Sequence, residues 1–275
     1  MTLLDADEGL HRWPDGAPAR WQENLFFICW DLTTATGVVA HLQRVPEEGI
    51  QAAQVAVAVD GVFGSATWTA PFRADGLVPE IVATPAQPWR RWTLQIDGKA
   101  AAGAGPLGFL ATEPGGDTPV GVDLTLESHL PPADFATGLA EVVAGLRSDA
   151  RGPQMGDQQH YEQGGTWRGR LRVGDRERTT AGLFVRDHSW GVRHEHSGFQ
   201  AFWTASCLDG GDRFCNAIGI LKPGGVIGIG LVADPSGVRA TSQVSAEFGP
   251  EPGIGSYDTV SVEYGDPLGL TLTAA

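Results

Sequence analysis

Short runs in which apolar and polar residues alternate recur along the whole chain, and they predict β-strands. Residues 24–31 (NLFFICWD) are almost continuously apolar, which is typical of a strand that is covered on both faces or lines a closed barrel. Residues 120–129 alternate between apolar and polar side chains, so we expect a strand with one buried and one solvated face. Residues 92–97 (WTLQID) alternate in the same way, and the Asp97-Gly98 pair predicts a hairpin turn at their end.

The second half of the chain repeats this pattern at a regular spacing. From residue 167 to 173, apolar residues alternate with arginines, and a Gly174-Asp175 turn leads into a strand over residues 179–190. Further short apolar runs, separated by turns rich in glycine, aspartate and proline, cover residues 199–208, 213–221, 226–233, 238–248, 260–264 and 270–273. Strands that recur about every ten residues are typical of up-and-down barrels and sandwiches.

One stretch between the two halves has the period of a helix instead. Its apolar residues recur at helical spacing after Asp134, a suitable N-cap, and are Phe135, Leu139, Val142, Val143 and Leu146. The following residues 147–157 are polar and contain glycine and proline, as linkers do. We therefore predict two domains, residues 1–150 and residues 151–275, joined by a helix-containing linker.

Two segments of the chain also resemble each other weakly. Residues 25–42 and 201–221 both read as apolar hairpins with a cysteine in the first arm and a polar turn. A repeat of this kind favours two related units in tandem. The predicted fold class is therefore all-β, with two tandem antiparallel β-barrels.

Composition and charge narrow the classes of function. The formal net charge of −14 and the pI of about 4.8 argue against binding to a phosphate backbone, so no nucleic-acid partner is expected. No run of eighteen apolar residues and no signal-peptide pattern occur, so we expect no transmembrane segment and a cytoplasmic location. The chain has three cysteines, Cys29, Cys207 and Cys215, and none of them forms a C-x-x-C pair. This indicates free thiols rather than a Cys207–Cys215 disulfide across a hairpin.

Ionisable side chains are concentrated in residues 181–196 (AGLFVRDHSWGVRHEH), behind an apolar start. Such groups are costly to bury without partners, so a strand that carries them inward suggests a site. Neighbouring residues of a strand point to opposite faces, so Asp187, His188 and Ser189 cannot form a Ser-His-Asp triad among themselves. The alternation leaves two sets that can face a cavity: Asp187 with Ser189, or Arg186 with His188 and Trp190.

A second polar group lies upstream at residues 160–163 (HYEQ). In an extended segment, His160 and Glu162 share a face, and with Asp187 and His188 they would form an acid–base cluster at one barrel mouth. We expect these four residues to be catalytic and a further group to contact the substrate, namely Arg186, Tyr161, Trp190, Phe199 and Trp203.

Two alternatives compete with this interpretation. Arg186 and Asp187 can simply form a buried ion pair between two strands, with Trp190 as a barrel plug. The His194-Glu195-His196 sequence offers two imidazoles of the kind that zinc sites use, but no third ligand is marked by local spacing, so a solvated loop is the better interpretation. We therefore predict neither a metal nor a cofactor.

The chain resembles a known family in three of these motifs. They are the WQENLFF segment at residues 21–27, HYEQ at residues 160–163 and RDHSWGVR at residues 186–193. Together they resemble the bacterial lipocalin-like proteins related to carotenoid 1,2-hydratase, on the branch that has no assigned activity. The resemblance covers most of the chain and implies two tandem calycin-type β-barrels. Characterised members hydrate isoprenoid double bonds, and related lipocalin-fold proteins are pericyclic and terpenoid cyclases.

The residues and the resemblance together lead to one main hypothesis: a cofactor-independent lyase (hydratase), cyclase or isomerase that acts on a hydrophobic terpenoid or polycyclic substrate. Asp187, or Glu162 kept protonated by burial, would protonate an alkene, and His188 or His160 would act as the base. Trp190 would shield the cation. The alternative is a lipocalin-like carrier that binds a hydrophobic ligand without chemistry, and a structural role comes third. A monomer and a homodimer are both compatible with the sequence.

Overall fold

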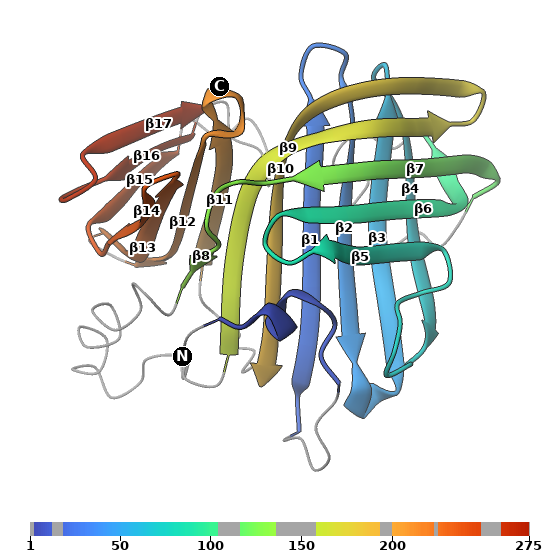
Figure 1. Ribbon diagram of the computed structural model, residues 1–275, viewed down its shortest axis with the longest axis horizontal. Coiled ribbons are helices and arrows are strands. Elements are labelled where there is room, and N and C mark those ends of the chain that lie inside the picture. The colour runs from blue at the N-terminus through green and yellow to red at the C-terminus, as the bar shows by residue number, and fades with distance from the viewer. Residues whose placement is uncertain are drawn as a thin grey trace.

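The computed structural model describes residues 3–12, 19–103, 116–135, 158–192, 200–222, 225–248 and 260–274. Within these ranges the chain is nearly all β-structure in antiparallel sheets, so the predicted all-β fold class is confirmed (Figure 1). In the described ranges, three short 3-10 helices accompany the strands: η1 (Asp5–Glu8), η2 (Pro46–Glu48) and η4 (Asp209–Gly211).

The larger unit is a 10-stranded sheet that closes on itself as a barrel (Figure 1). Neighbouring strands pair in the order β1, β2, β3, β4, β6, β7, β9, β10, and β10 pairs back with β1. Closure removes the free edges that an open sheet would present. The strands are β1 (Trp21–Asp31), β2 (Thr36–Val45), β3 (Ile50–Val59), β4 (Val62–Pro71), β5 (Ile81–Gln87), β6 (Arg91–Ala102), β7 (Thr118–Glu127), β8 (Ala133–Asp134), β9 (Gln158–Val173) and β10 (Arg176–Val192).

The hairpin of β9 and β10 belongs to this barrel, which differs from the domain assignment made from the sequence. β9 pairs with β7 and β10 pairs with β1, so the hairpin supplies both strands that close the ring. The predicted division at residue 150 places this hairpin in the second domain. Alternation along a strand identifies which face is buried but not which strand lies beside it. The partner of β10 is β1, which is more than 100 residues away in the sequence. The predicted helix and linker fall outside the described residues, apart from Phe135.

Apolar side chains fill the barrel. The inward residues of every strand of the ring form one buried cluster, which includes Leu25, Phe27, Leu42, Val57, Trp92, Leu94, Leu124, Trp167 and Phe184. Burial of one such side chain contributes about 1.5–3 kcal/mol, so this cluster supplies much of the driving force for closure. The long apolar run predicted as a barrel strand, residues 24–31, is β1.

The expected hairpin turn at Asp97-Gly98 is wrong. β6 continues through both residues and pairs with β7 over its length. Gly98 has a packing role instead, because a Cβ atom at this position would lie 2.6 Å from Cζ2 of Trp68. The glycine therefore makes room for an indole ring against the strand, which a sequence pattern does not distinguish from a turn.

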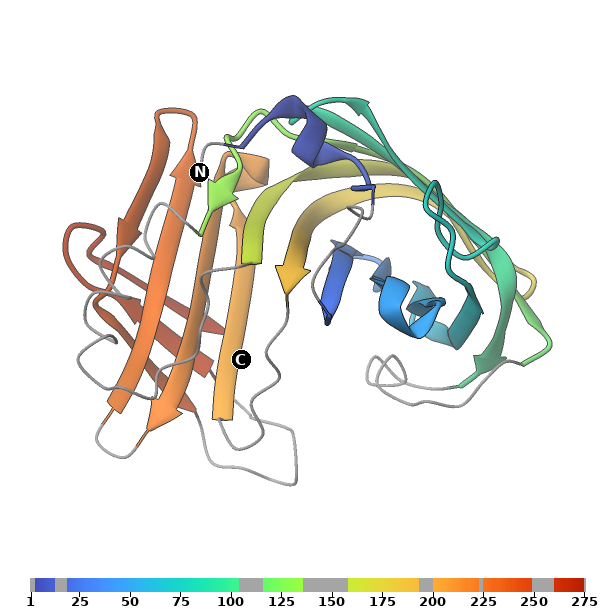
Figure 2. The ribbon, with the colours of Figure 1, turned by 90° about the horizontal axis from the view of Figure 1, so that it is seen from below.

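The second unit consists of two stacked sheets. One holds β11 (Gln200–Leu208), β12 (Arg213–Lys222), β13 (Gly225–Asp234) and β14 (Gly237–Thr241), and the other holds β15 (Val244–Phe248), β16 (Val260–Tyr264) and β17 (Leu270–Ala274). Phe202, Val232 and Tyr264 belong to the core between them. The other face of the four-stranded sheet packs on β10 through Phe214 and Val185, so β11 and β12 stand beside the barrel wall (Figure 2).

The three cysteines are free thiols, as expected. Cys207 lies opposite Phe214 and Cys215 lies opposite Ser206, so the two thiols point to opposite faces of the β11–β12 hairpin. This register excludes a disulfide between them.

Candidate functional site

Strand β10 distributes its side chains between two different environments. Arg186 and His188 point into the barrel, and Asp187 and Ser189 point toward the second unit. The pairing with β9 extends the division, because residues directly opposite each other share a face. Glu162 lies opposite Asp187, while Tyr161 lies opposite His188. Residues 186–189 therefore contribute to two clusters, an inner one inside the barrel and an outer one on the opposite face of the barrel wall.

The outer cluster joins three of the predicted catalytic residues. His160 Nε2 is paired with Asp187 Oδ2 and lies 3.3 Å from Glu162 Oε1. The carboxylate of Glu162 is fully buried and also accepts hydrogen bonds from the second unit, from Trp203 Nε1 at 2.7 Å and Asn216 Nδ2 at 2.6 Å. The cluster thus combines three residues of the barrel with two hydrogen-bond donors of the second unit.

An open pocket of about 320 Å³ begins at this cluster. Asp187 and His160 line it, whereas Glu162 lies behind them with no exposed surface. The same face of the barrel wall continues across β1 and β2, and the second unit supplies the remaining side of the pocket. The remaining lining residues are Asn24, Phe26, His41, Gln158, Ser189, Trp203 and Ile218. A concave site with aromatic walls and a few convergent polar groups is a typical binding site for a small molecule.

The electrostatics of the outer cluster keep a proton on the imidazole. Burial disfavours the charged form of His160, but the attraction of Asp187 and the hydrogen bonds with Asp187 and Glu162 exceed this effect and raise its pKa to about 10. Burial raises the pKa of Glu162, against the hydrogen bond and the charge of His160. Phe135 stacks on the His160 ring with centroids 4.2 Å apart, which shields one face of the imidazole from water.

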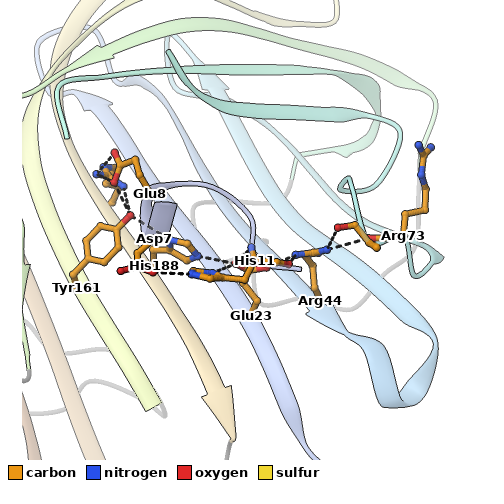
Figure 3. A network of polar contacts seen from close by, with 10 residues as sticks. Asp7, Glu8, His11, Glu23, Arg44, Arg73, Tyr161 and His188 are labelled. Atoms are coloured by element: carbon orange, nitrogen blue, oxygen red, sulfur yellow. Dashed lines mark hydrogen bonds and ion pairs between the residues drawn. The ribbon is translucent and has the colours of Figure 1, made fainter. Parts of the chain in front are cut away.

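The inner cluster fills the barrel end with hydrogen bonds (Figure 3). Arg186 is paired with Glu8 of η1 at 2.8 Å, and Tyr161 donates to the same carboxylate at 2.9 Å. His188 Nε2 lies 3.0 Å from Glu23 Oε1, and His188 Nδ1 lies 3.2 Å from the Tyr161 hydroxyl. Burial lowers the pKa of His188 despite the neighbouring Glu23.

The N-terminal segment, residues 3–12, is the part of this cluster that sequence reasoning missed. Besides Glu8, it contributes His11, whose ring lies 2.8 Å from Glu23 and stacks on Trp190 with centroids 4.2 Å apart. Glu23 is also paired with Arg44 of β2. The signal in the sequence is Glu23, in a polar run at the start of the apolar strand β1. Asn216 was missed as well, although it interrupts the apolar run of β12.

The predicted site residues therefore separate. His160, Asp187 and Trp203 line the pocket, with Glu162 directly behind them. The inner cluster instead contains or adjoins His188, Arg186, Tyr161 and Trp190. His188 cannot serve as a base in the pocket, because it points to the other face of β10. Arg186 and Asp187 do not pair with each other for the same reason, so that alternative is also wrong. Phe199 and the histidines at 194 and 196 lie outside the described residues.

Two groups in the described ranges place ligand-type atoms close enough to hold a metal ion. His11, Glu23 and His188 form one, and His160, Glu162 and Asp187 form the other. In each group the donor atoms lie within 4.8 Å of one another.

Comparison with known proteins gives the fold and the family. None of the helices in the described ranges has the length and apolar character needed to cross a membrane. Among curated proteins, none matches the sequence. The crystal structure of a Nitrosomonas europaea protein provisionally named AttH superposes with a TM-score of 0.62 and 13% identity, over 92% of this chain and 80% of that chain. At this identity the likeness concerns the fold, which is lipocalin-like.

A family model covers nearly the entire sequence. It is described as a domain of unknown function, DUF7064, and matches residues 4–273. The chain therefore belongs to the DUF7064 family.

Proposed function

We propose that this protein is a cofactor-independent enzyme that moves a proton on a small hydrophobic molecule bound between its two units. The observation that carries the proposal is the Asp187–His160 pair on the wall of the pocket, with Phe26 beside Asp187 on the same face and Trp203 and Ile218 contributed by the second unit. A positioned carboxylate and imidazole can accept and donate protons, and the apolar wall suits a terpenoid or polycyclic ligand. The described inward side chains of the barrel form one buried apolar cluster, which favours the pocket between the units as the substrate site.

The geometry also favours particular roles. The proton of the pair resides on His160, which lies between two carboxylates, so Asp187 acts as the acceptor and His160 as the donor. This reverses the role that the sequence suggested for Asp187. Glu162 does not reach the pocket and acts as a positioning residue that holds His160 through their 3.3 Å contact.

An imidazolium with a pKa near 10 is too weak an acid to protonate an isolated alkene readily. The pair is better suited to a carbon whose hydrogen is already acidified by a neighbouring carbonyl group. Among hydration, cyclisation and isomerisation, we therefore favour isomerisation of an enone or reversible addition of water to one. Asp187 would remove the proton from carbon or from water, and His160 would protonate the oxygen or carbon at which charge develops.

The experiment uses D₂O, because proton transfer at carbon leaves a deuterium label whatever the product. A panel of terpenoid and polycyclic ketones and enones is incubated with the protein, and deuterium incorporation is followed by mass spectrometry. We expect label in at least one compound and a loss of at least about 100-fold in rate for Asp187→Asn. Asp175→Asn, in the exposed turn of the same hairpin, is the matched control and keeps the native rate. Labelling that is unchanged in Asp187→Asn would contradict the assignment.

The alternative function, a carrier, has support in the aromatic wall of the same pocket. A carrier would bind members of the panel without labelling them. Its affinity would fall in Trp203→Ala, which removes part of the wall, and stay within a few-fold of native in Asp187→Asn. Binding with this pattern and no label in any compound would replace the enzymatic proposal.

A further inference from the structure

The inner cluster contains a second set of groups whose chemistry the proposed function does not use. His11 Nδ1 lies 2.8 Å from Glu23 Oε1, and His188 Nε2 lies 3.0 Å from the same oxygen (Figure 3). The donor atoms of the three residues all lie within 4.8 Å of one another. They come from the N-terminal segment, β1 and β10, so a ligand shared among them would join three parts of the chain.

We propose that His11, Glu23 and His188 bind one divalent transition-metal ion, with Zn²⁺ as the best fit. Two imidazoles and one carboxylate are ligands that zinc prefers, and three protein ligands leave a fourth position open. Tetrahedral coordination at about 2.0–2.1 Å would place ligand atoms about 3.3 Å apart. The present contacts of 2.8 and 3.0 Å need to widen by only a few tenths of an ångström.

The atoms behind the ligands support this proposal. Imidazoles that bind metals usually donate their other N–H to a carboxylate or another oxygen, which fixes the ring. His11 Nε2 lies 3.3 Å from Asp7 Oδ1, and His188 Nδ1 lies 3.2 Å from the Tyr161 hydroxyl. The second oxygen of Glu23 is held by Arg44. Each of the three ligands is thus held from behind, and their donor atoms lie within 4.8 Å of one another.

The local charge also suits a cation. Three carboxylates, those of Asp7, Glu8 and Glu23, face two guanidinium groups, those of Arg44 and Arg186. With neutral imidazoles, the group carries one net negative charge. Glu23 and His188 have no exposed side-chain surface, but the side chain of His11 is 19% exposed, so an ion can enter where the N-terminal segment meets the barrel. Bound metal would fasten this segment over the barrel end.

The test is metal binding by the full chain, purified without a histidine tag and stripped with a chelator. Titration calorimetry with Zn²⁺ is expected to show one saturable site, and Co²⁺ is expected to give the intense visible absorption of tetrahedral coordination. His11→Gln changes a partly exposed residue and leaves the barrel core intact. It should raise the Kd for Zn²⁺ by at least about 10-fold. Asp7→Asn should raise the same Kd by about 10–100-fold, which is the usual effect of losing the residue that hydrogen-bonds a metal ligand from behind.

Two controls keep the result specific. His129→Gln removes an exposed histidine paired with Asp212 and should bind as the native chain does. His160→Gln removes a ligand-type residue of the other cluster and should also bind normally. The proposal is overturned if neither ion binds in a saturable way, if His11→Gln binds as tightly as native, or if His160→Gln alone abolishes binding. The last result would place the ion at the pocket.

Discussion

At the scale of single residues, the His160 pair combines burial with charge. Its imidazole contacts two carboxylates and an aromatic ring, and its proton is held by attraction to Asp187 against the cost of desolvation. Glu162 has the opposite balance, because burial raises its pKa although three donors approach it. Buried polar networks of this kind are stable only when each member is satisfied. The network therefore depends on the second unit, which supplies Trp203 and Asn216.

The protonation of His160 predicts how stability changes with pH. Its pKa in the folded chain, about 10, lies above the ordinary imidazole value of 6.5. The stability that it contributes is fully present below pH 6.5 and is lost as the pH rises through about 10. Asp187 and Glu162 are the ionisable groups that face it. We expect the urea midpoint to fall between pH 7 and 10, and this decline to be smaller in His160→Gln. Equal slopes in the two proteins would contradict the prediction.

At the scale of elements, the N-terminal segment and the β9–β10 hairpin organise the polar interior. η1 places Glu8 so that it accepts hydrogen bonds from Trp92 Nε1 at 2.5 Å, from Tyr161 and from Arg186. Among the described residues, Glu8 is the carboxylate that pairs with Arg186, which would otherwise be a buried charge without an acidic partner. A few residues at the start of the chain thus neutralise a charge that strand β10 brings inside.

Removal of the Glu8 side chain is therefore expected to destabilise the folded chain. Glu8→Ala leaves the guanidinium of Arg186 buried and unpaired, which should lower the free energy of unfolding by about 3–5 kcal/mol. Chemical denaturation measures this difference. Asp5→Asn is the matched control, because Asp5 is exposed on the same short helix and its loss should cost less than about 1 kcal/mol. A Glu8→Ala protein as stable as the control would show that Arg186 finds another partner.

How far the sequence predicts these elements differs between the two clusters. The alternation of residues 182–190 predicts two sets of side chains on opposite faces, and β10 has them. Of the four residues expected in one cluster, His160, Glu162 and Asp187 lie together, whereas His188 does not. A local sequence pattern does not show which residues pair with the side chains on each face. Glu8 and Glu23 are 178 and 165 residues away from Arg186 and His188. Asn216 reaches Glu162 across the boundary between the units, so its role depends on tertiary packing.

At the scale of the whole molecule, the two units share one hairpin rather than one linker. β9 and β10 close the barrel with their inner faces, and their outer faces carry the pocket and pack on β11 and β12. The boundary between the sheets therefore follows residue 192, not residue 150.

Truncation distinguishes these two boundaries. A chain that ends at residue 192 retains every strand of the closed ring and should fold, with the far-ultraviolet circular dichroism of an antiparallel barrel. A chain that ends at residue 150 lacks β9 and β10 and should not fold, because β1 and β7 keep free edges. A folded 1–150 fragment would support the boundary predicted from the sequence.

The alternation of side chains along β10 has a consequence for how such proteins can diversify. Positions 186 and 188 are constrained by the barrel interior, whereas positions 187 and 189 face the pocket. Selection can therefore alter the pocket-facing positions of this strand without disturbing the network that closes the barrel. A saturation library over β10 would show the two classes directly, with loss of protein abundance at positions 186 and 188, and changes in activity or ligand preference at positions 187 and 189. One strand thus allows a stable scaffold to acquire new specificities, one alternate position at a time.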